Sequence, residues 1–349
     1  MIGFLTLLYA GTTLYIWNTP FYAEVVTKFK LTSQSAGNSY SSRGTSENLR
    51  KGTCNEKIKP VSIHIHKHKK PITDDEFGHY LAGLIDGDGY FSKNPQLVIV
   101  FRANDASLAY WLKSRLGHGT VRKVKDKNAY LFKLSSKGAI NNVLLLINNK
   151  LRTQNKYNQV INNVLTHFKE PISFKLNESS DLNNHWLAGF SDADASFQVK
   201  ILNRDNGKRV EIRLNYQVDQ KGSEILHLIK TRFGGNIGYR VSQDTYYYGS
   251  TSFGSAKKVI NYFDNYHLQS SKHINYLKWR KVYLMVQNKD HLTLKGQEKI
   301  KNIKNSMNSK SVETDKDFCN FKNKITCSRL IPNKNMSFWA LIIFLLKND

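Results

Sequence analysis

The sequence predicts an α+β fold made of two copies of one structural unit. The first observation is a repeated motif: residues Leu81–Phe91 read LAGLIDGDGYF, and residues Leu187–Phe197 read LAGFSDADASF. Each copy is an apolar stretch of helical character that ends in a pair of acids. The second observation is that strands, a helix, a hairpin and further helices follow each motif in the same order. Together these observations indicate an internal duplication.

The first copy runs through four further segments. PQLVIVFRA is typical of a strand, and ASLAYWLKSRLG predicts a helix that a glycine ends. GTVRKVKDKNAYLFKLSS predicts a hairpin with its turn near the Lys and Asn residues, and AINNVLLLINN predicts a closing helix.

The second copy repeats this order. SFQVKIL and RVEIRLNYQV predict strands, SEILHLIKTRFGG predicts a helix that again ends at glycine, and NIGYRVSQDTYYYGSTSF predicts a hairpin with Gln and Asp at its turn. AKKVINYFDNY predicts the closing helix, and a final helix follows a lysine-containing loop. We therefore expect four parts in the chain: residues 1–72, a first repeat at 73–170, a second repeat at 171–308, and a tail at 309–349.

The first part has two different compositions. Residues 1–17 are apolar and almost uncharged, which fits a degenerate leader, a fusion remnant or a membrane anchor. Residues 31–70 are rich in Ser, Asn, Gly and Lys, so we expect a linker there. His64, His66 and His68 alternate within it, but no carboxylate or cysteine cluster joins them, so we expect a solvated basic tract rather than a metal site. The three cysteines form no CxxC pair, which argues against both a disulfide framework and a zinc site.

The charge of the chain indicates its class of partner. Its 52 Lys and Arg residues exceed its 27 Asp and Glu residues by 52 − 27, which gives a net charge of +25. This excess is larger than solubility requires and favours a polyanionic partner, most simply a nucleic acid. A generally basic surface, or a genome biased toward Lys and Asn, is the competing interpretation.

Small residues in the two motifs predict a close helix pair. Gly83 and Gly87 stand four positions apart in the first motif, as do Gly189 and Ala193 in the second. Such spacing leaves a flat stripe on one helix face, so two of these helices can pack with their backbones close together.

If the helices cross as equivalents, the last acids, Asp88 and Asp194, emerge at the same end of the pair. Two neighbouring carboxylates repel each other unless a cation lies between them, and hard oxygen ligands suit Mg²⁺. A calcium-binding EF-hand is excluded, because the twelfth position counted from Asp86 is Leu97 rather than a glutamate. We expect Asp86 and Asp192 to have structural roles, with hydrogen bonds near the helix ends.

Both stretches resemble the signature of the LAGLIDADG homing endonucleases, in particular the single-chain, two-repeat type encoded in mitochondrial group I introns. The resemblance covers approximately residues 74–308 and includes YFDNYHLQSSKHINYLKWRKVYLMV and HLTLKGQEKIKNIKNSMN. It implies two pseudo-symmetric αββαββα repeats that meet at paired motif helices, with saddle-shaped sheets that bind DNA in the major groove. It also implies a mitochondrial location.

The resemblance further implies Mg²⁺-dependent hydrolysis of one phosphodiester in each strand of a double-stranded DNA target of about twenty base pairs, roughly two turns of the duplex. The enzyme would act as a monomer, with no protein partner. By this resemblance, Asp88 and Asp194 bind the metal ions with help from the backbone carbonyls of Gly87 and Ala193. These acids are the same two that packing and charge indicate.

The resemblance also assigns a polar and a basic residue to each acid. In the second repeat these are Gln220 of YQVDQKG and Lys272 of LQSSKHINYLKW. The first repeat departs from the pattern, because Asn104 replaces a glutamine and Lys156 stands at a less regular offset, with Lys150 as an alternative. Equal cutting of the two strands therefore does not follow from the resemblance.

Alternate residues on the strands would face the DNA. The basic residues on or beside the predicted strands are Arg102, Lys123, Lys125, Lys200, Arg204, Arg209, Arg213 and Arg240.

Two other functions fit the same features. One is an RNA maturase that binds its own group I intron and assists its splicing, because positive charge serves RNA as well as DNA. The other is a decayed remnant of a mobile element, suggested by the N-terminal segment and by Ser191 and Ala195 in the second motif.

Overall fold

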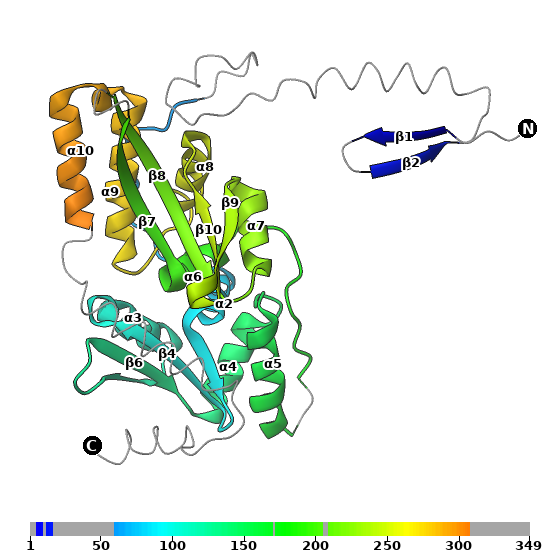
Figure 1. The fold of residues 1–349 in the computed structure, drawn as a ribbon. Helices are drawn as coiled ribbons and strands as arrows, with labels where there is room; N and C mark the ends of the chain where they lie inside the picture. The colour runs from blue at the N-terminus through cyan, green and yellow to red at the C-terminus, as the bar shows by residue number, and fades with distance from the viewer. Residues whose placement is uncertain (1–4, 10–11, 17–58, 170–171, 205–208, 308–349) are drawn as a thin grey trace, which may run out of the picture. The chain divides into compact units, whose positions relative to one another are not determined.

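The computed structural model describes residues 5–9, 12–16, 59–169, 172–204 and 209–307 (Figure 1). The chain divides into two compact units, Met1–Arg43 and Gly44–Asp349. In the first unit, β1 (Leu5–Tyr9) pairs with β2 (Thr12–Ile16) in an antiparallel hairpin. Within the described residues, no helix combines the length and apolar character that a membrane span needs. The three cysteines, the tail from residue 308 and the N-terminal half of the expected linker lie outside the described residues.

In the second unit, the first repeat has the predicted order of helix and strands. Its elements are α2 (Asp74–Asp88), β3 (Gly89–Ser92), β4 (Gln96–Arg102), α3 (Ala106–Leu116), β5 (Thr120–Lys123), β6 (Ala129–Leu134), α4 (Lys137–Ile147) and α5 (Gln154–Asn163).

The second repeat follows the same order and adds one helix. Its elements are α6 (Trp186–Asp194), β7 (Ala195–Arg204), β8 (Arg209–Gln220), α7 (Glu224–Phe233), β9 (Asn236–Arg240), β10 (Thr245–Ser250), α8 (Phe253–Phe263), α9 (Lys272–Gln287) and α10 (Leu294–Met307). The two four-stranded antiparallel sheets have the equivalent orders β3-β4-β6-β5 and β7-β8-β10-β9. The predicted α+β fold and its duplication are therefore confirmed.

Local sequence explains where the key elements begin and end. Thr73 and Glu76 form a capping box at the start of α2, in which the Thr73 hydroxyl accepts from the Glu76 N–H at 3.1 Å. Gly117 ends α3 with a φ of +69°, a left-handed conformation that favours glycine. Asp126 and Asp244 have positive φ values in the two hairpin loops, a conformation that Asp tolerates better than most residues.

The two motif helices, α2 and α6, pack directly against each other between the sheets (Figure 1). A Cβ atom added to Gly83 would lie 1.9 Å from the Trp186 carbonyl oxygen, and one added to Gly189 would lie 2.0 Å from the Tyr80 carbonyl oxygen. The contacts are equivalent, because Trp186 and Tyr80 each stand three residues before a motif glycine. Only glycine allows this approach of backbone to backbone, so the structure places the predicted small residues in the helix interface.

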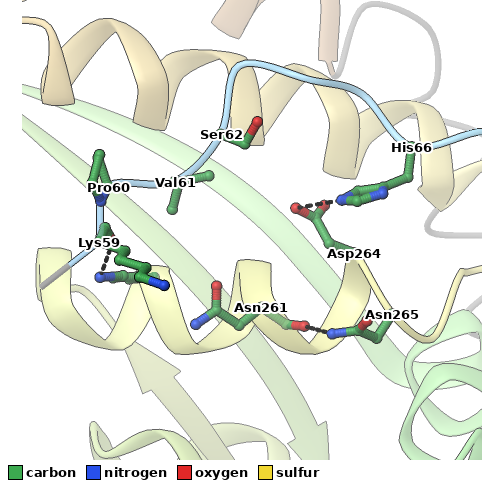
Figure 2. Close-up of a pocket in the computed structure, with 9 residues that line it drawn as sticks. Lys59, Pro60, Val61, Ser62, His66, Asn261, Asp264 and Asn265 are labelled. Carbon is green, nitrogen blue, oxygen red and sulfur yellow. Dashed lines mark hydrogen bonds and ion pairs between the residues drawn. The ribbon is translucent and has the colours of Figure 1, made fainter.

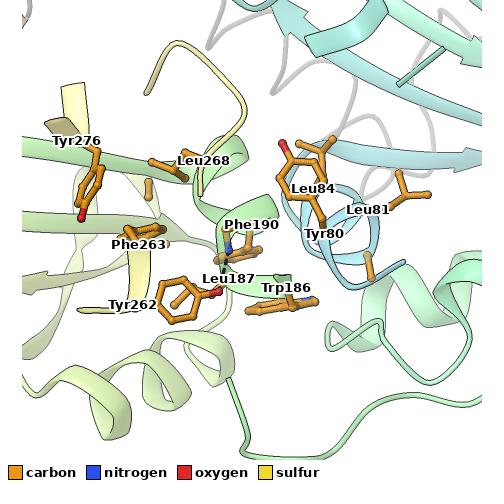
Figure 3. Packing of buried hydrophobic residues seen from close by; sticks show 14 of the residues in the cluster. Tyr80, Leu81, Leu84, Trp186, Leu187, Phe190, Tyr262, Phe263, Leu268 and Tyr276 are labelled. Atoms are coloured by element: carbon orange, nitrogen blue, oxygen red, sulfur yellow. Dashed lines mark hydrogen bonds between the residues drawn. The ribbon is translucent and has the colours of Figure 1, made fainter. Parts of the chain in front are cut away.

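Large apolar side chains surround this helix pair. Tyr80, Leu84, Trp186 and Phe190 are essentially fully buried, and Figure 3 shows them among the buried side chains around α2 and α6. The hydrophobic cluster extends from here beneath both sheets, so one continuous core supports both repeats.

Residues 59–72, which we call the strap, pack against the second repeat. Val61 is buried and exchanges two hydrogen bonds with the Gln287 side chain, at 2.9 and 3.1 Å. The buried Arg280 guanidinium donates to the Ser62 and His64 carbonyls and pairs with Asp264 at 2.9 Å. Part of the segment expected to be a linker is therefore ordered, because Val61 completes an apolar surface and Arg280 satisfies the backbone of the strap.

Candidate active site

The motif acids occupy equivalent positions at the ends of the two central helices. Asp88 is the last residue of α2 and Asp194 is the last residue of α6; the strands β3 and β7 begin at the next residue. A carboxylate at a helix C-terminus faces the negative end of the helix dipole, so each position favours a nearby cation. A Cβ atom on Gly87 would lie 2.3 Å from the Ala193 Cβ and 3.1 Å from Asp194 Oδ2, so the end of α2 lies against the second acid.

In the second repeat, the polar and basic residues proposed for the site lie beside the acid. The Gln220 side-chain amide, at the end of β8, donates to Asp194 Oδ2 at 2.6 Å. Lys272, the first residue of α9, donates from Nζ to the carbonyl oxygens of Ala193 at 2.8 Å and Ser191 at 3.1 Å. Both side chains therefore reach the C-terminal end of α6, where the acid is located.

In the first repeat, the structure separates the two candidate lysines. Lys156 on α5 is buried and donates from Nζ to the Gly89 carbonyl at 2.6 Å, directly after Asp88. Lys150 instead forms an ion pair with Asp75 in the first turn of α2, at the opposite end of that helix. Lys156 therefore lies beside the acid-bearing end of α2, as Lys272 lies beside that of α6, and Lys150 does not. The two lysines contact different carbonyls, because Gly89 follows Asp88 whereas Ala193 precedes Asp194.

Asn104 does not occupy the position equivalent to Gln220. Gly89 pairs with Ile99, and the equivalent Ala195 pairs with Val218. Phe101, which is buried, lies two residues beyond Ile99, and Gln220 lies two residues beyond Val218. Asn104 lies farther along, exposed on the 3-10 turn Ala103–Asp105. The register therefore places an aromatic ring in the first repeat where the second repeat has an amide.

The other two motif acids form a symmetric hydrogen-bond network. Asp86 accepts from the Arg152 N–H at 2.8 Å, the Thr153 N–H at 3.2 Å and hydroxyl at 2.5 Å, and the Trp186 indole N–H at 2.8 Å. Thr153 directly precedes α5, so Asp86 fixes the start of the helix that carries Lys156.

Asp192 is bound in the equivalent way. It accepts from the Gln269 N–H at 2.7 Å, from the Ser270 N–H at 3.2 Å and hydroxyl at 2.5 Å, and from the Tyr80 hydroxyl at 2.7 Å. Each acid thus binds an aromatic residue of the opposite motif helix and the loop before the lysine-bearing helix of its own repeat. Sequence analysis predicted a structural role for these acids but missed this connection to the lysines.

Burial changes the pKa of this network. Desolvation raises the pKa of Asp86 to about 6, although its hydrogen-bond donors oppose the shift. Desolvation also raises the pKa of Asp192, with the Ser270 hydroxyl opposing it.

The residues at the helix ends fit a hard divalent cation. Two carboxylates and neighbouring backbone carbonyl oxygens are the ligand types that Mg²⁺ prefers. The geometry at Gly87 supports this fit, since a methyl group there would contact Asp194 and fill the space between the two helix ends. Asp88 and Asp194 would hold the ions, with the carbonyls of Gly87 and Ala193 as further ligands.

The outer face of the second sheet carries four of the eight predicted basic residues. The pairing register places Lys200, Arg204 and Arg213 on this face, and Arg240 of β9 lies on the same face. Arg204 and Arg213 both donate to Glu211, at 2.9 and 2.7 Å, and the pKa of Glu211 is lowered chiefly by the Arg213 hydrogen bond. Arg240 pairs with Asp219 at 2.8 Å. The Arg209 side chain lies outside the described residues.

The same face carries an amide cluster that sequence analysis missed. Gln198, Asn215 and Gln217 lie on neighbouring strands and form mutual hydrogen bonds, with Asn215 Nδ2 donating to Gln198 Oε1 at 3.2 Å. Asn and Gln amides suit the edge of adenine, so this cluster can read bases. Strict alternation along β7 and β8 was the signal that could have revealed it.

The first sheet has a different outer face. The register places Arg102 there together with Arg122 and Lys133, two basic residues that the prediction omitted. Lys123 pairs with Tyr130 and therefore belongs to the opposite face, while Lys125 lies exposed in the hairpin loop. The same face carries three aliphatic residues, Val98, Val100 and Leu131, of which Val100 is buried, and also the polar residues Gln96 and Thr120.

Comparison with known proteins agrees with this geometry. A family model described as LAGLIDADG endonuclease matches residues 187–283, from the second motif into α9. The uncharacterized cox1 intron-2 37.2 kDa protein of Schizosaccharomyces pombe is 58% identical over 318 residues, which cover 86% of this chain and 97% of that protein.

Two relatives from Saccharomyces cerevisiae are more distant. The intron-encoded DNA endonuclease aI3 is 30% identical, over 61% of this chain and 65% of its own length. The intron-encoded RNA maturase bI4 is 27% identical, over 60% of this chain and 32% of its own length. This chain thus spans less than two-thirds of either protein.

A solved structure shares the fold. I-SmaMI bound to an uncleaved DNA target in the presence of calcium ions matches with a TM-score of 0.53 at 22% identity, over 66% of this chain and 98% of that chain. This likeness confirms the arrangement of two repeats and two antiparallel sheets.

Proposed function

This chain belongs to the LAGLIDADG endonuclease family, and on that premise we propose that it is a site-specific, Mg²⁺-dependent endodeoxyribonuclease that cuts both strands of a DNA target. One observation carries the proposal: each motif helix ends in an acid, and a lysine contacts the backbone beside each acid. A protein that only bound nucleic acid would have no need of two acids at the negative ends of two helices, directed toward a polyanion.

The residues around the acids have separate roles in this proposal. Bound Mg²⁺ would supply Lewis-acid activation of water and of the departing oxygen. Asp88 and Asp194 would each serve one strand. Lys156 and Lys272 would place a positive charge beside the scissile phosphates and stabilise the charge that develops on them. Gln220 would order water next to Asp194 through its amide, and no amide occupies the equivalent position in the first repeat.

The two outer sheet faces would hold the DNA. Lys200, Arg204, Arg213 and Arg240 would contact phosphates, while Gln198 and Gln217 would contact base edges. The buried Asn215 amide donates to both glutamines and would hold them in place. Since one chain contains both acids, it would act as a monomer. The 58% identical relative is a cox1 intron protein, which supports a mitochondrial location and an intron-homing role.

A second function has its own support. The likeness to the intron-encoded RNA maturase bI4, together with the net charge of +25, favours a role in splicing the host group I intron. Such a role needs phosphate contacts but not the paired acids.

The decisive experiment uses the full chain and DNA that carries the intronless junction of its host gene. We expect double-strand cleavage with Mg²⁺ and none with EDTA. The double variant Asp88→Asn/Asp194→Asn should still bind this DNA but should not cut it. Binding without any Mg²⁺-dependent cleavage by the wild-type chain would contradict the endonuclease. If the double variant still supported splicing of the intron RNA, that result would establish the maturase role separately.

A further inference from the structure

The strap and the second repeat bring three histidines together. His68 comes from the strap, His267 from the loop after α8, and His273 from the first turn of α9. One ring nitrogen from each lies within 4.8 Å of the other two. The ring centroid of His68 lies 4.6 Å from that of His273 and 5.6 Å from that of His267. The centroids of His267 and His273 are 5.4 Å apart.

We propose that His68, His267 and His273 form a binding site for a divalent transition metal, most simply Zn²⁺, that fastens the strap to the second repeat. Three imidazoles are a ligand set that Zn²⁺ accepts, with water in the fourth position. Mg²⁺ prefers oxygen ligands and would not bind here. This site is therefore chemically distinct from the pair of acids.

The hydrogen bonds of the rings leave nitrogens suited to a metal. His68 bonds through Nε2 to the Leu268 carbonyl at 2.8 Å, and His267 bonds through Nε2 to the Asp264 carbonyl at 3.1 Å. A backbone carbonyl on one ring nitrogen fixes the tautomer and leaves the other nitrogen as a ligand, which is the usual outer-shell arrangement of metal-binding histidines. His273 Nδ1 is buried and has no hydrogen-bond partner among the described residues.

The protonation state of the cluster also suits a metal. Burial lowers the pKa of His267, and it lowers the pKa of His273 to about 4, with the neighbouring histidines adding to the shift. Both rings are thus neutral at pH 7, the form that binds a metal.

Metal binding requires two small adjustments. His267 Nδ1 accepts from the Lys69 N–H at 2.8 Å, and the metal would replace this hydrogen bond. Tetrahedral ligands at zinc distances lie roughly 3.4 Å apart, so the rings must move inward slightly. His68 is exposed and can rotate to do so. A metal–imidazole bond contributes more than the neutral hydrogen bond that it displaces.

The strap already lies in the position that such a clamp would secure. Figure 2 shows it passing between α8 and α9, with His66 directed at Asp264, 3.9 Å away. A cavity of about 340 Å³ lies beneath it and contains no member of the histidine cluster. Its lining residues are Lys59, Pro60, Val61, Ser62, His66, Lys257, Asn261, Asp264 and Asn265. The metal would therefore fasten the end of the strap nearest α2. That end is held by polar contacts of His68 and Lys69, whereas the other end is held by the buried Val61.

Sequence analysis expected a solvated basic tract, not a metal site, at the three histidines of the strap. His64, His66 and His68 alternate along the strap, but only His68 belongs to the cluster. Its two partners are about two hundred residues away in the chain, so no local pattern could have revealed them.

The test measures zinc rather than DNA cleavage, so it can fail while the endonuclease proposal stands. The full chain is treated with chelator, dialysed against Zn²⁺ and analysed for bound metal. We expect one Zn²⁺ per chain in the wild type and at least tenfold weaker binding for His68→Ala. His64→Ala is the matched control, because His64 lies on the same strap but outside the cluster. The substitution keeps the His64 backbone carbonyl that accepts from Arg280, so this variant should bind Zn²⁺ as the wild type does.

A second measurement follows the strap itself. Trypsin can cut after Lys67 and Lys69, which are both exposed. Zn²⁺ should slow these cuts in the wild type and in His64→Ala but not in His68→Ala, and Mg²⁺ should slow them in none. Equal zinc binding by wild type and His68→Ala, or no stoichiometric zinc in the wild type, would overturn the proposal.

Discussion

The two repeats have the same arrangement at the acids but differ at the neighbouring residue and on the sheets. Asp88 and Asp194 end equivalent helices, and a lysine contacts a backbone carbonyl next to each acid: Lys156 contacts that of Gly89, after Asp88, and Lys272 contacts that of Ala193, before Asp194. However, Gln220 binds Asp194, whereas buried Phe101 stands at the corresponding position beside β3. The two repeats thus share an acid at the helix end with a lysine beside it, and they differ in the residues around that acid.

The sheets show the same division. The outer face of the second sheet carries Gln198, Asn215 and Gln217, whereas that of the first carries Val98, Val100 and Leu131. Amides discriminate base edges by hydrogen bonds, and aliphatic groups can contact the methyl group of thymine. Under the proposed function, the two half-sites of the DNA target would therefore be read by different chemistry.

The largest expected effect comes from removing one acid at a time. Asp88→Asn and Asp194→Asn should each reduce cleavage of one strand by about 10³-fold or more, because the ligands of its metal are lost. On a plasmid with the target site, each variant should yield nicked circles, and strand-specific end labels should show opposite strands.

This prediction also tests the assignment of one acid to each strand. Equal loss of both cuts in each variant would show that the acids act as one shared site. DNA binding in Ca²⁺ would serve as the control that both variants fold.

The buried acids predict a pH-dependent stability. Burial raises the folded-state pKa of Asp86 from its ordinary value of 3.8 to about 6, so the folded state holds a proton between these pH values that the unfolded state has lost. Falling pH across this window should therefore stabilise the wild type relative to Asp86→Asn, which cannot titrate, by up to about 3 kcal/mol. Urea unfolding of both chains between pH 4 and 7 measures the difference, and a constant gap would contradict the raised pKa.

A smaller effect is expected at the lysines. Lys156→Met and Lys272→Met keep the length of the side chain but remove its charge, and each should slow one strand by roughly 100-fold. Lys150→Met is a matched control, since Lys150 pairs with Asp75 at the far end of α2 and should leave both cuts unchanged. Strand-resolved single-turnover rates would distinguish these outcomes.

The sequence was sufficient for the parts of this molecule that depend on local pattern. The motif helices, the hairpins and the helix ends at Gly117 and Gly234 follow from periodicity and from glycine conformation. The proximity of Gln220 and Lys272 to the second acid followed only from the resemblance, because strand ends and helix starts far apart in the chain meet there.

Other features depend on register and on long-range packing. A shift in register changes the face of every residue on a strand, which is why Lys123 was included and Arg122 and Lys133 were omitted. The same limit applies to Asn104. The resemblance aligned it with Gln220, but Asn104 lies on a 3-10 turn whereas Gln220 lies at the end of a strand. The strap was expected to be a linker because its composition is polar, yet Val61 and the buried Arg280 hold it in place.

The smallest expected effect tests the asymmetry between the repeats directly. Gln220→Ala removes the amide that donates to Asp194 at 2.6 Å and should slow the strand served by Asp194 by about tenfold, the loss typical of one hydrogen bond to a charged group. Asn104→Ala should leave the other strand unchanged, because Asn104 is exposed and lies outside the equivalent position. Strand-specific rates for both variants, with DNA affinity as the control, make the comparison. If Asn104→Ala slowed its strand as much as Gln220→Ala slows the other, the side chain would have to reach Asp88 when DNA binds, and the two repeats would be more alike than their registers indicate.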